Sequence, residues 1–64
     1  MGTELAARMR NRANLDHLPP DHEMRTAADT FDKAHDEQWE TKMFLAAWAR
    51  ARTTWCHYTQ EPLA

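Results

Sequence analysis

The feature that most constrains this 64-residue chain is a run of 41 residues, 21–61, that contains neither proline nor glycine. Glycine and proline, the two strongest turn-forming residues, are therefore missing over almost two thirds of the sequence. A continuous helix of that length would extend roughly 60 Å at about 1.5 Å per residue, whereas a compact domain of this size has a radius of gyration of only about 11 Å. The run must either bend without these residues or belong to an extended molecule.

Composition favours helix and leaves few residues for a core. The chain contains no valine or isoleucine, while alanine, arginine, glutamate, methionine and leucine recur. These residues favour helix over strand. We therefore expect an all-α fold in a single small domain over residues 1–64, which is close to the lower size limit for a stable lone core.

A pair of prolines divides the expected helices. We expect a first helix over about residues 3–16, a Pro-Pro turn over 17–21 and a long second helix over about 22–59. Pro19 and Pro20 bias the residues before them away from helix, and Asp21 is well suited to cap the helix that follows. The result is a helical hairpin, in which the short N-terminal helix folds back along part of the long one.

The continuity of the second helix is open at residues 36–42. This stretch is polar apart from Trp39, and the apolar stripes before and after it lie on different sides of an ideal helix. The helix either breaks here, giving three helices, or continues and presents different faces to different partners. The absence of glycine, proline and asparagine from this stretch favours a continuous helix.

An aromatic stripe late in the chain is the candidate partner interface. Its residues follow a spacing of 4-3-4-3, which places them on one helix face: Phe44, Trp48, Ala51, Trp55 and Tyr58. Such stripes are usually buried in a core or a subunit interface. Because the first helix has a narrow apolar face, we interpret the stripe as an interface with a second copy or a larger protein. The favoured function is a small non-catalytic helical interaction subunit or accessory protein that needs no cofactor.

Two alternative functions use other residues. Asp32 and His35 resemble the Glu-x-x-His element of di-iron helical bundles, so oligomerisation could assemble a metal-binding bundle; a solvated helix face is the alternative. Arg8 and Arg12 share a face of the first helix and could serve a small nucleic-acid-associated regulator. Binding to nucleic acid is made unlikely by the net charge of −2 and the isoelectric point of about 6.0.

Enzymatic activity and a membrane location are not expected. Cys56 and His57 are sequence neighbours, so on a helix their side chains point about 100° apart and cannot form a nucleophile–base pair. The single cysteine rules out a disulfide within the chain, and no apolar run is long enough to span a bilayer. We expect a cytoplasmic location, and the alanine- and arginine-rich composition is typical of a bacterial source.

Residues 39–46, Trp-Glu-Thr-Lys-Met-Phe-Leu-Ala, resemble the helical Trp-Glu-x-x-x-Phe-x-Leu segment of nitrile hydratase β subunits and their activator proteins. The glycine and the aromatic-Trp-x-Glu pattern that follow this segment in that family are absent, and residues 52–55 read Arg-Thr-Thr-Trp instead. The resemblance covers eight positions, and no functional residue is transferred from it.

Overall fold

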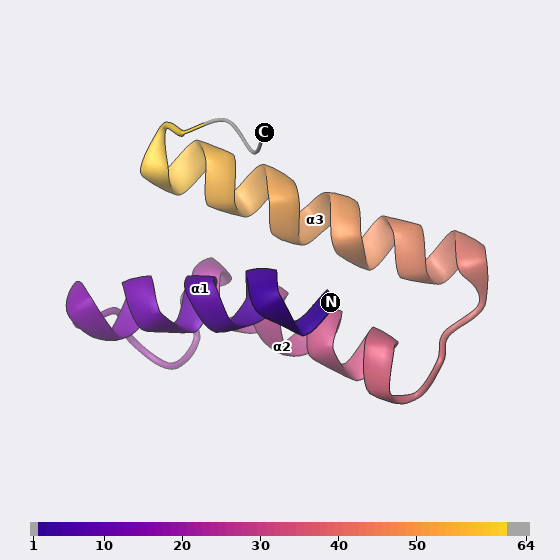
Figure 1. The fold of residues 1–64 in the computed structure, drawn as a ribbon. Coiled ribbons are helices and arrows are strands. Elements are labelled where there is room, and N and C mark those ends of the chain that lie inside the picture. The colour runs from indigo at the N-terminus through magenta and orange to yellow at the C-terminus, as the bar shows by residue number, and fades with distance from the viewer. Residues whose placement is uncertain (1, 62–64) are drawn as a thin grey trace.

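The fold consists of three helices joined by short loops. A computed structural model describes residues 2–61, with α1 at Gly2–Leu15, α2 at Glu23–Asp36 and α3 at Thr41–Thr59 (Figure 1). The expectation of an all-α fold is confirmed. The expectation of a two-helix hairpin with one long helix over about 22–59 is wrong, because that helix ends at Asp36 and a new one begins at Thr41. The expected single domain also includes residues 1 and 62–64, which lie outside the described residues.

The middle helix, α2, holds the other two together. In Figure 1, α1 and α3 run in the same direction and α2 runs opposite to both. Helix α2 packs extensively against α1 and against α3, whereas α1 and α3 contact each other much less. The radius of gyration is 11.1 Å, as expected for a compact domain of this length. The conflict set by the glycine- and proline-free run is thus resolved by a sharp break in the chain.

The core is made mainly of alanine. Eleven apolar residues are buried among those described, and seven of them are alanines; the four larger ones are Met9, Met24, Phe31 and Trp55. Because an alanine side chain is a single methyl group, helices that meet through alanines can pack with their backbones close together. The core therefore depends on close helix packing more than on side-chain volume, and most of the bulky side chains lie at its edges.

The break after α2 uses a left-handed residue that is not glycine. Gln38 has a φ of 51°, its N–H donates to the carbonyl oxygen of His35 at 3.3 Å, and the N–H of Trp39 donates to that of Ala34 at 3.0 Å. This pair of bonds is a Schellman motif, which normally takes glycine at the left-handed position. The motif turns the chain so that Trp39 packs against the core. We infer that this burial offsets the cost of the left-handed conformation, about 1 kcal/mol.

The same motif ends α1. His17 has a φ of 55°, and the N–H of Leu18 donates to the carbonyl oxygen of Ala13 at 2.9 Å. Leu18 then packs against the core, as Trp39 does after α2. The two prolines follow directly, so this break coincides with the turn expected at 17–21.

Helix α2 is capped by His22, not by Asp21 as the sequence suggested. His22 has extended backbone angles, φ −64° and ψ 144°, and its ring Nδ1 accepts a hydrogen bond from the N–H of Met24 at 3.1 Å. The N–H of His22 itself donates to the carbonyl oxygen of Pro19 at 3.1 Å. Because of this turn, the extended residue that caps the helix is His22, one position after Asp21, although aspartate is the residue type preferred at a cap.

Substitution at Gln38 tests the break. Gln38→Gly should raise the free energy of unfolding by about 0.5–1 kcal/mol, because glycine adopts a positive φ without steric cost. Gln38→Val should lower it, because a β-branched side chain disfavours this conformation. Urea denaturation of both variants measures the effect. A destabilised Gln38→Gly protein would contradict the left-handed break.

Candidate protein-interaction surface

The predicted interface stripe turns inward over much of its length. Ala51 is fully buried, Trp55 is 6% exposed, and both belong to the core of the chain itself. Phe44 is partly buried, and its ring centre lies 5.7 Å from that of Phe31 on α2. The five stripe residues do share one face of α3, but that face is the one that packs on the other helices. Of the five, Trp48 is the most exposed, at 39%.

The last part of this stripe contacts α1 through arginines. The guanidinium of Arg8 lies 5.2 Å from the ring centre of Trp55, and that of Arg12 lies 5.8 Å from the ring centre of Tyr58. Asp16 accepts hydrogen bonds from the Tyr58 hydroxyl and from Arg12, and these bonds lower the pKa of Asp16 and raise that of Tyr58. The two arginines of the nucleic-acid alternative therefore both take part in contacts between α1 and α3.

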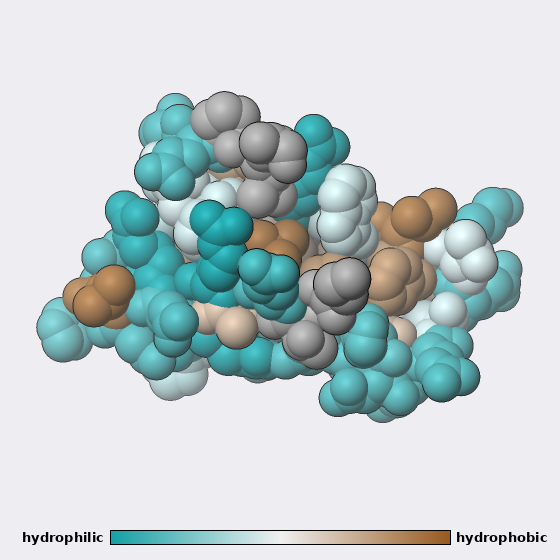
Figure 2. Space-filling view, viewed as in Figure 1, coloured by the Kyte–Doolittle hydropathy of each residue, from teal (hydrophilic) through white to brown (hydrophobic). Residues whose placement is uncertain are grey.

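Large apolar side chains are exposed near the start of α3. Met43 and Leu45 are each 54% exposed. Together with Trp48 they lie within a stretch of six residues, 43–48. Apolar atoms gather at the end of the molecule where α3 begins in the view of Figure 2. Helix α1 starts opposite the middle of α3 in Figure 1, so it does not extend along this part of α3. Leu15, at the end of α1, is also exposed.

A second stripe runs along the outside of α3, and sequence reasoning missed it. We call it the outer stripe, and its residues are Lys42, Leu45, Ala49, Arg52 and Cys56. They follow a spacing of 3-4-3-4, and all are exposed except Cys56, which is half-buried. Trp48 borders the stripe, with the guanidinium of Arg52 5.4 Å from its ring centre. Its spacing was visible in the sequence, but its mixture of charged and apolar residues gives no clear hydrophobic period.

The charge on α3 is entirely positive. Residues 41–59 contain no aspartate or glutamate. Arg50 is neutralised by Glu23 of α2, to which it donates two hydrogen bonds of 2.8 and 2.9 Å. Within residues 2–61, no carboxylate lies within ion-pair distance of Lys42 or Arg52. The outer stripe is therefore the side of α3 on which positive charge is left unbalanced.

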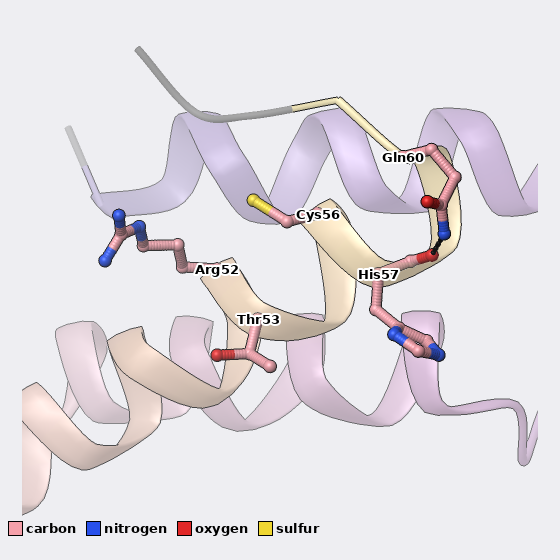
Figure 3. A pocket seen from close by; sticks show the side chains of 5 residues that line it. All are labelled: Arg52, Thr53, Cys56, His57 and Gln60. Carbon is pink, nitrogen blue, oxygen red and sulfur yellow. Dashed lines mark hydrogen bonds between the residues drawn. The ribbon is translucent and has the colours of Figure 1, made fainter.

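One hollow on α3 does not bring reactive groups together. It has a volume of about 450 Å³, is open to solvent and is lined by residues of the C-terminal half of α3: Arg52, Thr53, Cys56, His57 and Gln60. Figure 3 shows that the Cys56 thiol and the His57 ring point to different sides of the helix, as the sequence predicted. The only hydrogen bond drawn among these residues runs from the Gln60 side chain to the His57 carbonyl oxygen, at 2.7 Å.

Two smaller grooves lie between α2 and α3. One includes Thr30, Trp39 and Met43 and has a volume of about 260 Å³; the other includes His22, His57 and other residues near the end of α3 and has a volume of about 330 Å³. The Arg50–Glu23 ion pair contributes one residue to each groove. Both grooves thus lie beside a contact that already holds α2 and α3 together.

The candidate metal ligands have other surroundings. The Asp32 carboxylate forms an ion pair with Arg10 of α1 and is 23% exposed, while the exposed His35 ring lies 6.5 Å from that of Phe44. Among the residues that the structure describes, no three histidine, cysteine, aspartate or glutamate side chains gather as a metal site requires. Arg10 also binds Asp29, at 2.7 Å, so these carboxylates join α1 to α2.

Comparison of the chain with protein-family models, with curated proteins and with solved structures finds no significant match. None of the helices within residues 2–61 is both long and apolar enough to cross a membrane.

Acid should weaken the contact between α2 and α3. The hydrogen bonds from Arg50 lower the pKa of Glu23 from 4.5 to about 2. The ion pair therefore contributes its full stability above about pH 4.5, and this contribution is lost as the pH falls toward 2. The Glu23 side chain is 50% exposed, so the contribution is about 1 kcal/mol or less.

Glu23→Gln should lower the stability at pH 7 and should make it fall less steeply than wild type between pH 4.5 and 2. Urea denaturation at a series of pH values measures both effects. Glu61→Gln, a matched change beyond the end of α3, should behave as wild type. A Glu23→Gln profile parallel to that of the wild type would contradict the role of this ion pair.

Two tryptophan substitutions separate core from surface. Trp55→Ala should lower the free energy of unfolding by about 3 kcal/mol or more, because it opens a cavity in the small core. Trp48→Ala should cost about 1 kcal/mol or less, because that side chain is partly solvated. Thermal unfolding followed by circular dichroism measures both variants. Equal losses, or a larger loss for Trp48→Ala, would show that this assignment is wrong.

Proposed function

We propose that this chain is a small non-catalytic helical interaction subunit, or accessory protein, that binds a protein partner on the outer side of α3. The observation that carries the proposal is the exposure of two large apolar side chains on this side of the helix, Leu45 at 54% and Trp48 at 39%; Met43 is also exposed but lines the groove between α2 and α3. Solvation of such side chains is unfavourable, and exposed apolar surface on a small protein commonly marks a binding site.

The distribution of side-chain size supports this proposal. The buried core uses seven alanines, while a tryptophan, a leucine and a methionine lie at the surface of one helix segment. A core that is short of volume would gain from burying these residues, yet the fold leaves them outside. Tryptophan is also the residue type that most often dominates the binding energy of an interface. Trp48 is therefore the expected centre of the contact.

The partner is either a second copy of the chain or a larger protein. Of the aromatic stripe, Trp48 can reach it, whereas Phe44 packs against the core and Ala51 and Trp55 are buried within the chain. The proposal is thus narrower than the sequence interpretation. It moves the contact from the whole stripe to the outer side of α3 and adds Leu45 to it.

The arrangement of polar groups favours a binding function over catalysis. The hollow on α3 holds a thiol and an imidazole that point apart. The groove near the end of α3 is lined by His22, Glu23, His57 and Tyr58, but three of these groups already bind elsewhere in the fold: His22 Nδ1 accepts from the Met24 N–H, Glu23 accepts from Arg50, and the Tyr58 hydroxyl donates to Asp16.

No contact in the structure supports the two alternatives, a metal-binding bundle and a nucleic-acid regulator. Asp32 forms an ion pair with Arg10, and Arg8 and Arg12 lie over aromatic rings of α3. Arg12 also forms an ion pair with Asp16, so of the four candidate residues His35 alone is without such a contact among the described residues.

Site-specific photocrosslinking in the cell that produces the protein tests the function. A photoreactive amino acid at position 45 should give one defined protein adduct, whose mass distinguishes a self-dimer from a complex with another protein. The same amino acid at position 33, exposed on α2, is the control and should not give that adduct. Diffuse labelling that is equal from both positions would show that the outer side of α3 is not an interface.

A further inference from the structure

We propose that the outer stripe of α3 binds an acidic amphipathic helix. The carboxylates of this partner helix would lie against Lys42 and Arg52, and its apolar face against Leu45 and Trp48. This inference rests on the proposed function, because it assigns a chemistry to the partner. Its basis is the combination, on one exposed helix face, of helix-packing spacing, exposed apolar groups and unbalanced positive charge.

The spacing of the outer stripe fits a second helix. Residues that repeat at 3-4-3-4 form a nearly straight seam along a helix, and such seams pack against another helix at a small crossing angle. Ala49 lies near the middle of the stripe and is exposed. Its small side chain lets a partner backbone approach closely there, while Leu45 and Trp48 stand on one side of it as anchors. An extended peptide would not match this repeat.

The positive charges on the outer stripe favour a partner of negative charge. Lys42 and Arg52 lie at either end of the apolar section, and no carboxylate among the described residues pairs with them. Arg52 also lies over the Trp48 ring, so its positive charge is held beside the exposed apolar surface. A carboxylate that reached Arg52 would form a charged hydrogen bond beside this apolar surface, and such bonds are stronger than neutral ones.

The acidic groups near the stripe limit where the partner can lie. Glu37 and Glu40 are exposed just before α3 begins. They would repel an acidic helix that extended past Lys42 toward the loop. The partner is therefore placed from Lys42 toward Cys56, along the part of α3 that carries no acidic residue. The positive charge of this stretch is too small, and its apolar groups too few, to favour a membrane surface over a helix.

A pair of synthetic peptides tests the inference on the full chain. The acidic peptide is a helical repeat with leucine at the seam positions and glutamate on both flanks, and the basic peptide replaces each glutamate with lysine. Titration of the protein into fluorescein-labelled peptide, followed by anisotropy, should show micromolar binding of the acidic peptide. The affinity should fall as salt is added, because part of the attraction is between exposed charges.

Charge reversal on the protein gives the decisive comparison. Arg52→Glu should weaken binding of the acidic peptide about tenfold, and the double variant Lys42→Glu, Arg52→Glu should bind the basic peptide instead. Lys33→Glu, the same charge change on the exposed face of α2, is the matched control and should bind the acidic peptide as wild type does. Circular dichroism establishes that each variant is folded.

Several results would overturn the inference. These are no binding of the acidic peptide, equal binding of both peptides, an equal loss with Lys33→Glu, or binding to phosphatidylglycerol vesicles at concentrations where the acidic peptide does not bind. A defined crosslink from position 45 together with any of these results would leave the interaction function intact and reject only the acidic partner. Binding of the acidic peptide without a defined crosslink from position 45 would show that the stripe can bind an acidic helix but would reject the proposed function in the cell.

Discussion

The packing of two helices on one is the constraint from which the rest of this structure follows. Helix α2 carries five buried residues, three of them alanines, and it packs against both neighbours: Met24, Ala27, Ala28, Phe31 and Ala34. A single 14-residue helix can pack against two neighbours only if both helices approach it closely, and the small alanine side chains permit this close approach. The bulky side chains are then displaced to the edges, where Trp39 and Leu18 close the core and Leu45 and Trp48 stay in contact with solvent.

Arginine contacts fix which neighbour lies on which side of α2. Arg10 reaches Asp29 and Asp32 from α1, and Arg50 reaches Glu23 from α3. Alanine surfaces alone discriminate poorly between alternative packings, since one methyl group resembles another. The second oxygen of Asp32 is buried with no hydrogen-bond partner, so this carboxylate depends on Arg10 for its stability in the fold. We infer that these pairs contribute more to the choice of arrangement than to the total stability.

The sequence was sufficient for the helical class and for the turn at the two prolines, because composition and proline act locally. It offered a break within residues 36–42 as one of two alternatives but favoured a continuous helix, so it did not decide for the break at Gln38. The chain turns there with a left-handed glutamine, and the available signal is only that Trp39 is an isolated apolar residue in a polar stretch. Ala34 and Trp39 are five residues apart, as are Ala13 and Leu18, and each pair joins a helix end to the residue that packs after it. This spacing could have revealed the break.

For the candidate site, the sequence identified α3 and Trp48 but not the side of the helix that stays exposed. The aromatic stripe had the stronger periodicity, and strong periodicity is what a core needs, so its central residues are buried. The outer stripe could not be recognised by hydropathy, because it mixes apolar and charged side chains. Deciding which face turns outward required knowledge of where α1 ends relative to α3, and that depends on tertiary packing.

The order of the helices in space follows their order in the chain. Since α1 meets α2 and α2 meets α3, while α1 and α3 touch only through a few side chains, most contacts join segments that are near neighbours in sequence. Closing such short loops costs little entropy, and chains with this kind of topology reach the folded state rapidly. The surface of α3 is completed only when α1 docks, because Arg8 and Arg12 of α1 lie over the rings of Trp55 and Tyr58 on α3.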